Sequence, residues 1–571
     1  MVGAAAARES SRRALHVQSI IFGSAAADMV VQCVLLGVAL FTRLMALRWS
    51  AKAGLNADEA VPGLMALHIA GGREWPVFYY GQQYFGALEA YLTAGLFKVV
   101  GFQPWLVFVV PTFASLTLVP LSVALARRLP GPGVSTDERK WVGWLGALPV
   151  AASTPVMARM LAHAGGGFAL AYALQLAALY CVVRASVVEG EARRVVRWAA
   201  LFALASGLLC WVWQPALPVT AILLVVLCAR RPLLLRPLPL MLVIVCLLVG
   251  LLPALLYNVV QGYPTVAELL RKAATPPDQA PAAVTGSPWV LVILIAWALS
   301  GGEDTTGWGN VAQAIVVTLA FGVVMALAIR ATLERARPAG ALSVAPVAAC
   351  IDWRVAGILA LAVIAHVVAA HGAVRHLHPA VLIAFVFLGA VPVACFGASA
   401  RLHRARVSTA GVLALAIAVP NLIGLPIAAG VYQARPRLGE ELHELIDGLR
   451  ARGLTRGYAD YWTAYPLTFW SGETIIVAPL GPMTYGGRFD RYPPHTEFVN
   501  ERVRFDGLFL LAEAQCKTAA STHYLEAAGV SYREERLGRY RLLWDLRSTM
   551  PWMERENVEV WRWVIATEDV C

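Results

Sequence analysis

Long apolar runs separated by short polar loops constrain this chain more than any other feature of its sequence. Runs of about 18–22 apolar residues match the thickness of a bilayer's hydrocarbon core. Of the 571 residues, 58% are hydrophobic and 15% are charged, whereas roughly a quarter of a soluble domain is charged. The pattern predicts an α-helical polytopic membrane protein. Apolar runs lie near residues 28–48, 105–126, 141–158, 167–184, 198–213, 215–229, 237–257, 310–330, 355–372, 379–398 and 409–430.

The positive charges of the loops predict how these runs cross the membrane. If the N-terminus is cytoplasmic, the inside segments hold 21 Lys and Arg residues and the outside segments of the same region hold eight. Cytoplasmic loops are the ones enriched in Lys and Arg. The ratio favours 11 spanning helices with the C-terminus outside. A nucleic-acid binder would instead gather its positive charge in one patch with aromatic residues.

Two further apolar stretches, residues 76–101 and 288–300, would break this parity if they spanned the membrane. In the first, Gln82, Gly86 and Glu89 would share one helical face, with apolar residues on another. Both stretches are therefore predicted to be helices that lie in the outer interface.

An acidic pair, Asp58 and Glu59, stands in the long first external loop, residues 49–104, within the sequence "NADEA". Acidic residues at a helix start are favourable because they meet the exposed N–H groups and the positive end of the dipole. A carboxylate at a partly buried site can also act as a general base. The structural and the catalytic interpretation are compatible.

Other polar groups converge on the same predicted outer face. Arginine is costly inside a membrane and is usually paired or functional, and its planar guanidinium suits phosphate oxygens. Aromatic residues at helix ends are ordinary members of the interfacial belt, and Arg375 has the alternative role of a lipid anchor. The candidates for binding donor phosphate are Arg375, Arg159 and Arg43, and those for binding substrate are Gln82, Tyr84, Glu89, His163, Trp213, Tyr257, Asn258 and His376.

The composition changes after residue 430. Residues 1–430 carry a net charge of +14, and residues 431–571 carry −3. We therefore divide the chain into a transmembrane domain, 1–430, and a small extracytoplasmic α/β domain, 431–571. An amphipathic helix is predicted at 438–453 and a short helix at 522–529, with strands at 456–461, 474–480, 505–513, 531–538 and 539–546.

Four segments resemble the GT-C membrane glycosyltransferases, in particular the bacterial branch related to protein mannosyltransferases and aminoarabinose transferase (families 39 and 83). "NADEAVPGLMALHIAGG" is similar to the first external loop of these enzymes, and "YYGQQYFGALEAYLTAGLFKVVG" to the segment after it. "RHLHPAVL" resembles their external arginine motif, and "GYADYWTAYPLTFWSGETIIVAP" their extracytoplasmic tail. The resemblance extends over the whole chain.

The resemblance implies an inverting sugar transfer at the outer face of a bacterial cytoplasmic membrane. The donor would be a sugar on a polyprenyl phosphate, and no cofactor is implied. Asp58 matches the general base, with Glu59 in a supporting role and Arg375 placed to stabilise the leaving phosphate. Protein hydroxyls, lipid A, O-antigen and other envelope glycans all fit as acceptors.

One departure from the family pattern concerns metal binding. Many members carry another acidic residue in the second external loop, but here that loop contains Arg159 and His163. A divalent metal shared by the two loops is therefore not expected. The main alternative function is a transporter or flippase, which would show internal repeats and polar groups near the bilayer midplane. No repeat is apparent, and the polar groups lie at the predicted outer face.

Overall fold

The computed structural model describes ten parts of the chain, which form two compact units. The helical unit comprises 1–46, 112–162 and 168–429, and the α/β unit comprises 47–111, 163–167 and 430–571. The first external loop thus belongs to the same unit as the C-terminal region. The described residues are 25–53, 55–131, 134–267, 351–369, eight positions within 382–392, 403–433, 438–480, 490–501, 508–513 and 529–548.

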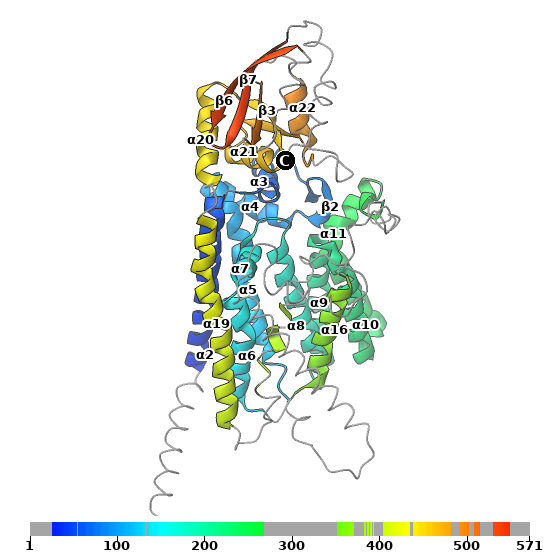
Figure 1. Cartoon of the computed structure of the whole chain (residues 1–571). Helices are drawn as coiled ribbons and strands as arrows, with labels where there is room; N and C mark the ends of the chain where they lie inside the picture. The colour runs from blue at the N-terminus through cyan, green and yellow to red at the C-terminus, as the bar shows by residue number, and fades with distance from the viewer. Residues whose placement is uncertain are drawn as a thin grey trace, which may run out of the picture. The chain divides into compact units, whose positions relative to one another are not determined.

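Long apolar helices dominate the helical unit (Figure 1). Among the described residues, five helical segments have the length and hydropathy to cross a membrane: Ala25–Arg48, Pro104–Ala126, Phe168–Val187, Ala192–Val212 and Pro237–Val260. The predicted polytopic membrane class is confirmed. The helices are α2 (Ala25–Ala53), α5 (Val109–Ala126), α6 (Thr136–Ala151), α7 (Pro155–Ala162), α8 (Phe168–Val187), α9 (Ala192–Val212), α10 (Leu217–Arg230), α11 (Pro237–Val260), α16 (Trp353–Ala369) and α19 (His403–Gln433).

Some predicted helices cannot be compared with the structure. The runs at 288–300 and 310–330 lie outside the described residues, and so does most of 379–398. Short 3₁₀ turns precede α5, α10 and α11, at Pro104–Phe108 (η1), Gln214–Ala216 (η2) and Pro232–Leu235 (η3).

Helices α9 and α11 pack closely because each has a glycine at the crossing point. A Cβ atom on Gly207 would lie 2.3 Å from the Leu247 carbonyl oxygen, and one on Gly250 would lie 2.6 Å from the Leu204 carbonyl oxygen. Both distances are too short for any side chain. Small residues at such crossings are the usual way for apolar helices to approach each other within a membrane.

The predicted single helix at 141–158 is wrong, because α6 ends at Ala151 and α7 begins at Pro155. Proline lacks the N–H that would continue the helix. The carbonyl groups left at the end of α6 need other donors. Arg43 Nη2 donates to the Val150 carbonyl at 2.8 Å, and Asn421 Nδ2 donates to the Ala152 carbonyl at 2.5 Å.

The described residues of the α/β unit form two sheets. The larger has the strand order β4-β3-β5-β7-β6, in which β3 is parallel to β4 and β5, and β7 is antiparallel to β5 and β6. Its strands are β3 (Arg456–Asp460), β4 (Ile476–Leu480), β5 (Leu508–Glu513), β6 (Val530–Leu537) and β7 (Tyr540–Ser548), and its helices are α20 (Leu438–Ala451), α21 (Tyr461–Trp470) and α22 (Pro493–Glu501).

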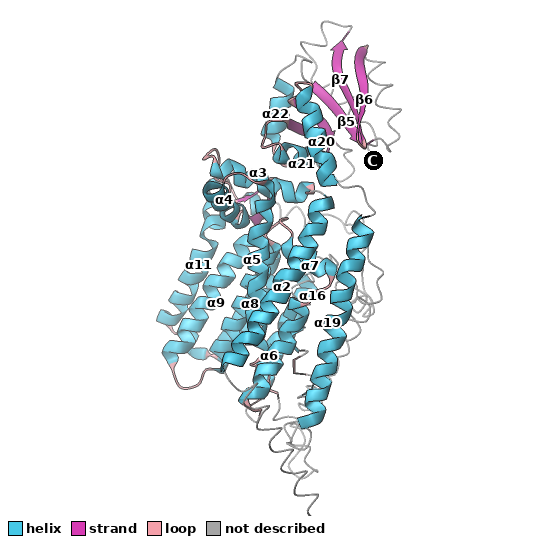
Figure 2. Cartoon of the chain, turned by 90° about the vertical axis from the view of Figure 1, so that its left-hand side faces the viewer, coloured by secondary structure: helices cyan, strands magenta, loops and turns pink. Residues whose placement is uncertain are grey.

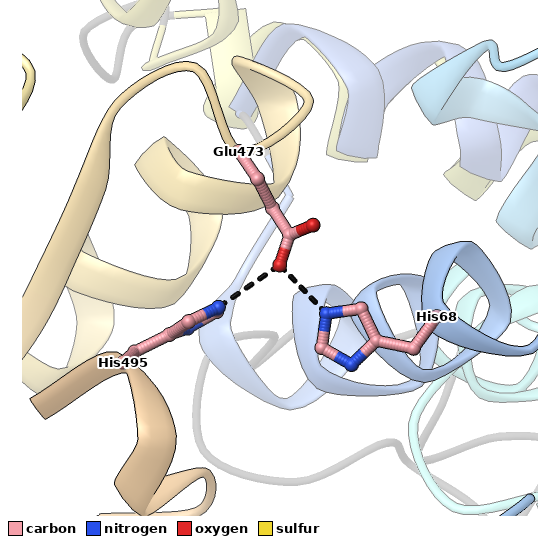
Figure 3. A group of neighbouring side chains, drawn as sticks. All are labelled: His68, Glu473 and His495. Carbon is pink, nitrogen blue, oxygen red and sulfur yellow. Dashed lines mark hydrogen bonds and ion pairs between the residues drawn. The ribbon is translucent and has the colours of Figure 1, made fainter. Parts of the chain in front are cut away.

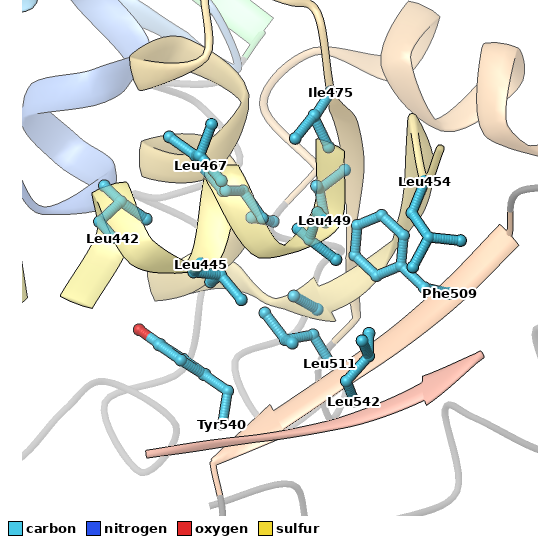
Figure 4. Packing of buried hydrophobic residues seen from close by; sticks show 14 residues of the cluster. Leu442, Leu445, Leu449, Leu454, Leu467, Ile475, Phe509, Leu511, Tyr540 and Leu542 are labelled. Atoms are coloured by element: carbon cyan, nitrogen blue, oxygen red, sulfur yellow. The ribbon is translucent and has the colours of Figure 1, made fainter. Parts of the chain in front are cut away.

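Figure 2 shows α20, α21 and α22 beside the strands of this sheet, and the buried side chains form a cluster on each of its faces. Leu445 and Leu449 of α20 pack with Leu467 of α21 on one face, over Phe509 and other strand residues (Figure 4). The opposite face buries a second cluster that includes Val499 of α22. Neighbouring residues of a strand point to opposite faces, so Leu510 and Leu511 enter different clusters. The predicted helix at 438–453 and the strands are confirmed, while 522–529 lies outside the described residues.

The first external loop contributes α3 (Ala57–Ala70), a two-stranded hairpin and α4 (Leu88–Val100). The prediction of one interfacial helix at 76–101 is therefore wrong in its first half. Residues 78–86 form antiparallel strands β1 (Phe78–Tyr79) and β2 (Gln82–Gly86). Aromatic residues favour strands, and Gly81 turns the chain with a φ of 66°.

Helix α3 packs closely against α21. A Cβ atom on Gly63 would lie 2.5 Å from Cζ of the buried Phe469 ring. Phe97 and Phe102 surround the same ring, with centroid distances of 6.5 and 5.5 Å. The ring therefore has little room to move, and only glycine fits at position 63.

We expect Gly63→Ala to destabilise the protein by about 1–3 kcal/mol, the usual cost of overpacking a core. A thermal-unfolding assay of the detergent-solubilised protein would show a lower Tm. Gly95→Ala is the matched control, because it is exposed in α4 with nothing within 4 Å of a Cβ atom. It should leave the Tm unchanged or raise it. Equal effects of the two substitutions would contradict the packing argument.

Candidate functional site

The start of α3 is fixed by a reciprocal cap. The Asn56 side chain accepts a hydrogen bond from the Glu59 N–H at 2.9 Å, and Glu59 Oε2 accepts one from the Asn56 N–H at 3.0 Å. Such a capping box satisfies two of the N–H groups that a helix start leaves unpaired. It also sets the direction of Asp58, which lies between these two residues.

Glu59 is almost completely buried, with 2% of its surface exposed. Its second oxygen, Oε1, lies 2.6 Å from Nδ1 of His163. Both carboxyl oxygens are therefore engaged, one in the cap and one with the segment 163–167. The supporting role that the resemblance implied for Glu59 stays a prediction.

Asp58 is the accessible member of the pair, with 43% of its side chain exposed. Its Oδ1 accepts a hydrogen bond from the Tyr461 hydroxyl at 2.9 Å and lies 3.7 Å from Nη2 of Arg491. Arg491 Nε also donates to the Tyr461 hydroxyl, at 3.2 Å. When the side-chain amide of Gln82 is turned so that its oxygen faces Arg491, that oxygen accepts hydrogen bonds from Nη1 and Nη2 of the guanidinium, both at 2.7 Å.

Tyr461 is suited to orient Asp58. Burial is the main cause that raises the pKa of Tyr461 well above its usual value, and the negative charge of Asp58 acts in the same direction. The phenol therefore keeps its proton and donates to Oδ1. The contacts of Asp58 within the described residues all reach Oδ1, and Oδ2 remains available to a ligand.

Glu89 forms a second buried acidic position, 1% exposed, in α4. Its Oε1 accepts a hydrogen bond from Tyr79 at 3.3 Å. Burial raises the pKa of Glu89 to about 7, although the charge of His163 and the Tyr79 hydrogen bond act in the opposite direction. A carboxyl group with this pKa can exchange a proton near neutral pH.

Among the described residues, no group of metal-ligating side chains includes Asp58 or Glu59. Within the described ranges, the group of His, Asp and Glu side chains that converges closely enough to share an ion is His68, Glu473 and His495.

The remaining predicted residues lie elsewhere. Arg43 is fully buried in the helical unit, where its guanidinium donates to Thr42, Ser153 and backbone carbonyls of α6. These contacts cap the end of α6, and the donor-binding role of Arg43 stays a prediction. Arg159 lies in α7, half-buried, in the helical unit.

The aromatic and amide candidates of the helical unit also have structural contacts. Trp213 is buried and packs edge to face on Tyr172, with ring centroids 6.2 Å apart. Asn258 bonds to the Ala254 carbonyl and to Thr265 at the end of α11. Binding roles for Trp213, Asn258 and the half-buried Tyr257 stay predictions.

Three further candidates complete the comparison. Tyr84 lies in β2 beside Phe85, with centroids 4.8 Å apart. Arg375 and His376 lie outside the described residues. Their binding roles likewise stay predictions.

Sequence reasoning missed the two residues that contact Asp58. Tyr461 lies within the "GYADYWTAY" segment that carried the family resemblance, but its partner was not predicted. Arg491 had no signal, since it is one of 17 Lys and Arg residues in the tail. Both lie more than 400 positions from Asp58 in sequence.

Comparison with solved structures identifies the fold. The crystal structure of the aminoarabinose transferase ArnT from Cupriavidus metallidurans bound to undecaprenyl phosphate is 14% identical, with a TM-score of 0.59. The apo state of the same protein is 15% identical, with a TM-score of 0.59. Each comparison covers 91% of this chain and 98% of ArnT.

The apo oligosaccharyltransferase from Archaeoglobus fulgidus is more distant, at 12% identity and a TM-score of 0.51, over 89% of this chain and 72% of that one. No family model and no curated protein matches the sequence. The chain has the fold of the GT-C membrane transferases, which confirms the fold class that the resemblance implied.

We expect Glu89→Gln to stabilise the protein at high pH. The pKa of the Glu89 carboxyl group rises from 4.5 to about 7 on folding. The folded protein therefore binds this proton more tightly than the unfolded protein does. The contribution of Glu89 to stability is present below pH 4.5 and is lost as the pH rises to 7. At about 1.4 kcal/mol per pH unit, the loss is on the order of 3 kcal/mol.

Thermal unfolding of wild type and Glu89→Gln between pH 5 and 8 measures this effect. The Tm of the variant should exceed that of wild type above pH 7, and the difference should shrink toward pH 5. A pH-independent difference would show that Glu89 is ionised throughout, contrary to the effect of its burial.

Proposed function

We propose that this protein is an integral-membrane glycosyltransferase that moves a sugar from a polyprenyl phosphate to an acceptor hydroxyl. The observation that carries the proposal is the geometry of Asp58. One oxygen is held by Tyr461 and Arg491, and the partly exposed carboxylate stands at the start of α3. A fixed carboxylate with an available oxygen is what a general base requires.

The reaction needs two forms of assistance. An alcohol is a weak nucleophile, so a base must remove its proton as it attacks the anomeric carbon. Oδ2 of Asp58 is proposed to accept that proton. The bond to the phosphate breaks as the new glycosidic bond forms, and a single displacement inverts the anomeric centre. Holding both substrates in line supplies much of the remaining acceleration.

The leaving group is a lipid phosphate, whose negative charge grows in the transition state. A guanidinium placed against its oxygens would stabilise that charge. We propose Arg375 for this role, with the resemblance of "RHLHPAVL" to the external arginine motif as the support. Arg159 is proposed as a second contact for the lipid phosphate.

The fold supports the proposed donor class. ArnT was crystallised with undecaprenyl phosphate, and the present chain has a similar fold over 91% of its length. The proposed place of reaction is the outer face of a bacterial cytoplasmic membrane, with the N-terminus inside and the C-terminal region outside. This orientation follows from the distribution of Lys and Arg among the loops.

A transporter or flippase is the second candidate, since it too would be polytopic. The two functions differ in what happens to the donor. A flippase moves an intact lipid-linked sugar across a vesicle membrane, whereas a transferase separates sugar from lipid phosphate.

Asp58→Asn should lower the transfer rate by about 10²–10⁴-fold, because the amide cannot accept the acceptor's proton. The purified full-length protein would be incubated with a panel of polyprenyl-phosphate sugars and candidate acceptors, and released polyprenyl phosphate would be measured. Donor binding should persist, because the substitution leaves the phosphate contacts intact.

Asp447→Asn is the matched control for this experiment. Asp447 is exposed on α20 in the same unit, and the Asp447→Asn variant should turn over donor at the wild-type rate. Equal turnover by Asp58→Asn and wild type would remove Asp58 from the chemistry. Movement of intact donor without any sugar transfer would favour the flippase.

Arg375→Ala should weaken donor binding by about 10-fold or more, since a charge-assisted phosphate contact is worth more than a neutral one. The affinity for polyprenyl phosphate in detergent micelles provides the measurement. An unchanged affinity would make Arg375 a lipid anchor and leave the role of Asp58 untouched.

A further inference from the structure

Three potential metal ligands meet at the C-terminal end of α3. Nε2 of His68 lies 2.6 Å from Oε1 of Glu473, and Nε2 of His495 lies 2.9 Å from the same oxygen. Figure 3 shows both rings directing a nitrogen at this oxygen. The three ligand atoms lie within 4.8 Å of one another. His68 is 1% exposed and His495 is 5% exposed, so the group is shielded from water.

The hydrogen bonds around His68 favour the tautomer with its proton on Nδ1. The Tyr80 hydroxyl donates to Glu74 Oε2 at 2.6 Å, and the Tyr492 hydroxyl donates to the other Glu74 oxygen. The Tyr80 oxygen is therefore free to accept, and His68 Nδ1 lies 2.7 Å from it. With the proton on Nδ1, the lone pair of Nε2 faces the Glu473 carboxylate.

Two lone-pair groups at this distance repel unless a positive charge stands between them. A hydrogen bond between the two groups would remove this repulsion, and so would a metal ion. The arrangement around His68 fits a metal ligand, because a ligating histidine normally donates its other N–H to an outer partner that fixes the ring. Tyr80 and Glu74 form such an outer chain.

The backbone at Glu473 also favours this placement. Glu473 has a φ of 60°, directly after Gly472 with a φ of 63°. A non-glycine residue in the left-handed region carries a cost of roughly 1–3 kcal/mol, and such residues gather at ligand sites. The conformation directs the carboxylate toward α3, where Arg73 pairs with the second oxygen, Oε2.

We propose that His68, Glu473 and His495 bind a Zn²⁺ ion. Two imidazoles and a carboxylate are a recurrent zinc ligand set, with bonds of about 2.0–2.2 Å. Ligand atoms around a tetrahedral ion with such bonds are about 3.3 Å apart. The present separations of 2.6 and 2.9 Å need to widen by less than about 1 Å. The fourth position is left to water or another small ligand.

The ion would join two parts of the α/β unit that are distant in sequence. His68 belongs to α3 in the first external loop, while Glu473 and His495 follow α21 and begin α22. The ion would thus lock the end of α3 to the C-terminal sheet region. This proposal rests on the side-chain geometry alone and is independent of the proposed glycosyl transfer.

The test uses full-length protein purified without a polyhistidine tag. After removal of metal with a chelator and dialysis, Zn²⁺ is titrated in by calorimetry and bound metal is measured by mass spectrometry. We expect one Zn²⁺ per chain and a higher Tm with the ion. Co²⁺ in the same site should give the intense visible absorption bands of tetrahedral coordination, a signature that an ion pair between side chains cannot produce.

Variants then assign the ligands. His68→Ala, Glu473→Gln and His495→Ala should each lose the stoichiometric ion, while His443→Ala should keep it, since His443 is exposed on α20 and bonds to Trp470. Tyr80→Phe removes the outer partner of His68 and should weaken Zn²⁺ binding by about 10–100-fold.

Two results would overturn the proposal. Wild type that binds no Zn²⁺ or Co²⁺ would show that hydrogen bonds between the three side chains hold the group together. Stoichiometric binding that survives all three ligand substitutions would place the ion elsewhere. The wild-type Co²⁺ spectrum decides the question even if a variant fails to fold.

Discussion

The close approach of α3 to α21 is the constraint on which the candidate site depends. At Gly63 the helix has no side chain, and the Phe469 ring fills the space where one would be. A larger residue would push the two segments apart. Because this contact lies near the middle of α3, it controls what both ends of that helix meet.

Along α3, the residues of the C-terminal region that it contacts follow in the order of the sequence. Asp58 at the start of α3 meets Tyr461 at the start of α21, and His68 near the end meets Glu473. Ten residues of helix span about 15 Å. The C-terminal segment thus holds α3 at three points, with the polar contacts at the ends and the apolar one between them. The carboxylate proposed as the base is therefore held by a packed structure, although it lies in what the sequence presents as a loop.

The sequence predicted the elements of this arrangement better than their contacts. An amphipathic helix followed by short strand-like segments identified the C-terminal sheet region, because such patterns reflect the burial of single elements. The hairpin at 78–86 was mistaken for helix, since its aromatic residues fit either an interfacial helix or a strand. The break between α6 and α7 was missed although Pro155 signals it, because the apolar run continues through it.

The site itself shows where sequence reasoning ends. A carboxylate pair at a helix start was recognisable from "NADEA", and the fold resemblance favoured Asp58. Nothing in the sequence states that Glu59 turns inward to cap the helix and meet His163, or that Arg491 reaches Asp58. Those contacts are set by tertiary packing between segments hundreds of residues apart. The different surroundings of the two adjacent acids could therefore be recognised only from the structure.

Burial also distinguishes Glu59 and Glu89 from Asp58. Glu59 and Glu89 are both buried, and His163 is the basic group whose charge acts on Glu89 and whose ring contacts Glu59. One imidazole can balance one carboxylate, and a second ionised acid in the same apolar surroundings would be unpaired. Glu89, which lacks the cap and the short histidine contact, is the one whose proton is retained toward neutral pH. Asp58, partly exposed and held through one oxygen, is the acid that a substrate can reach.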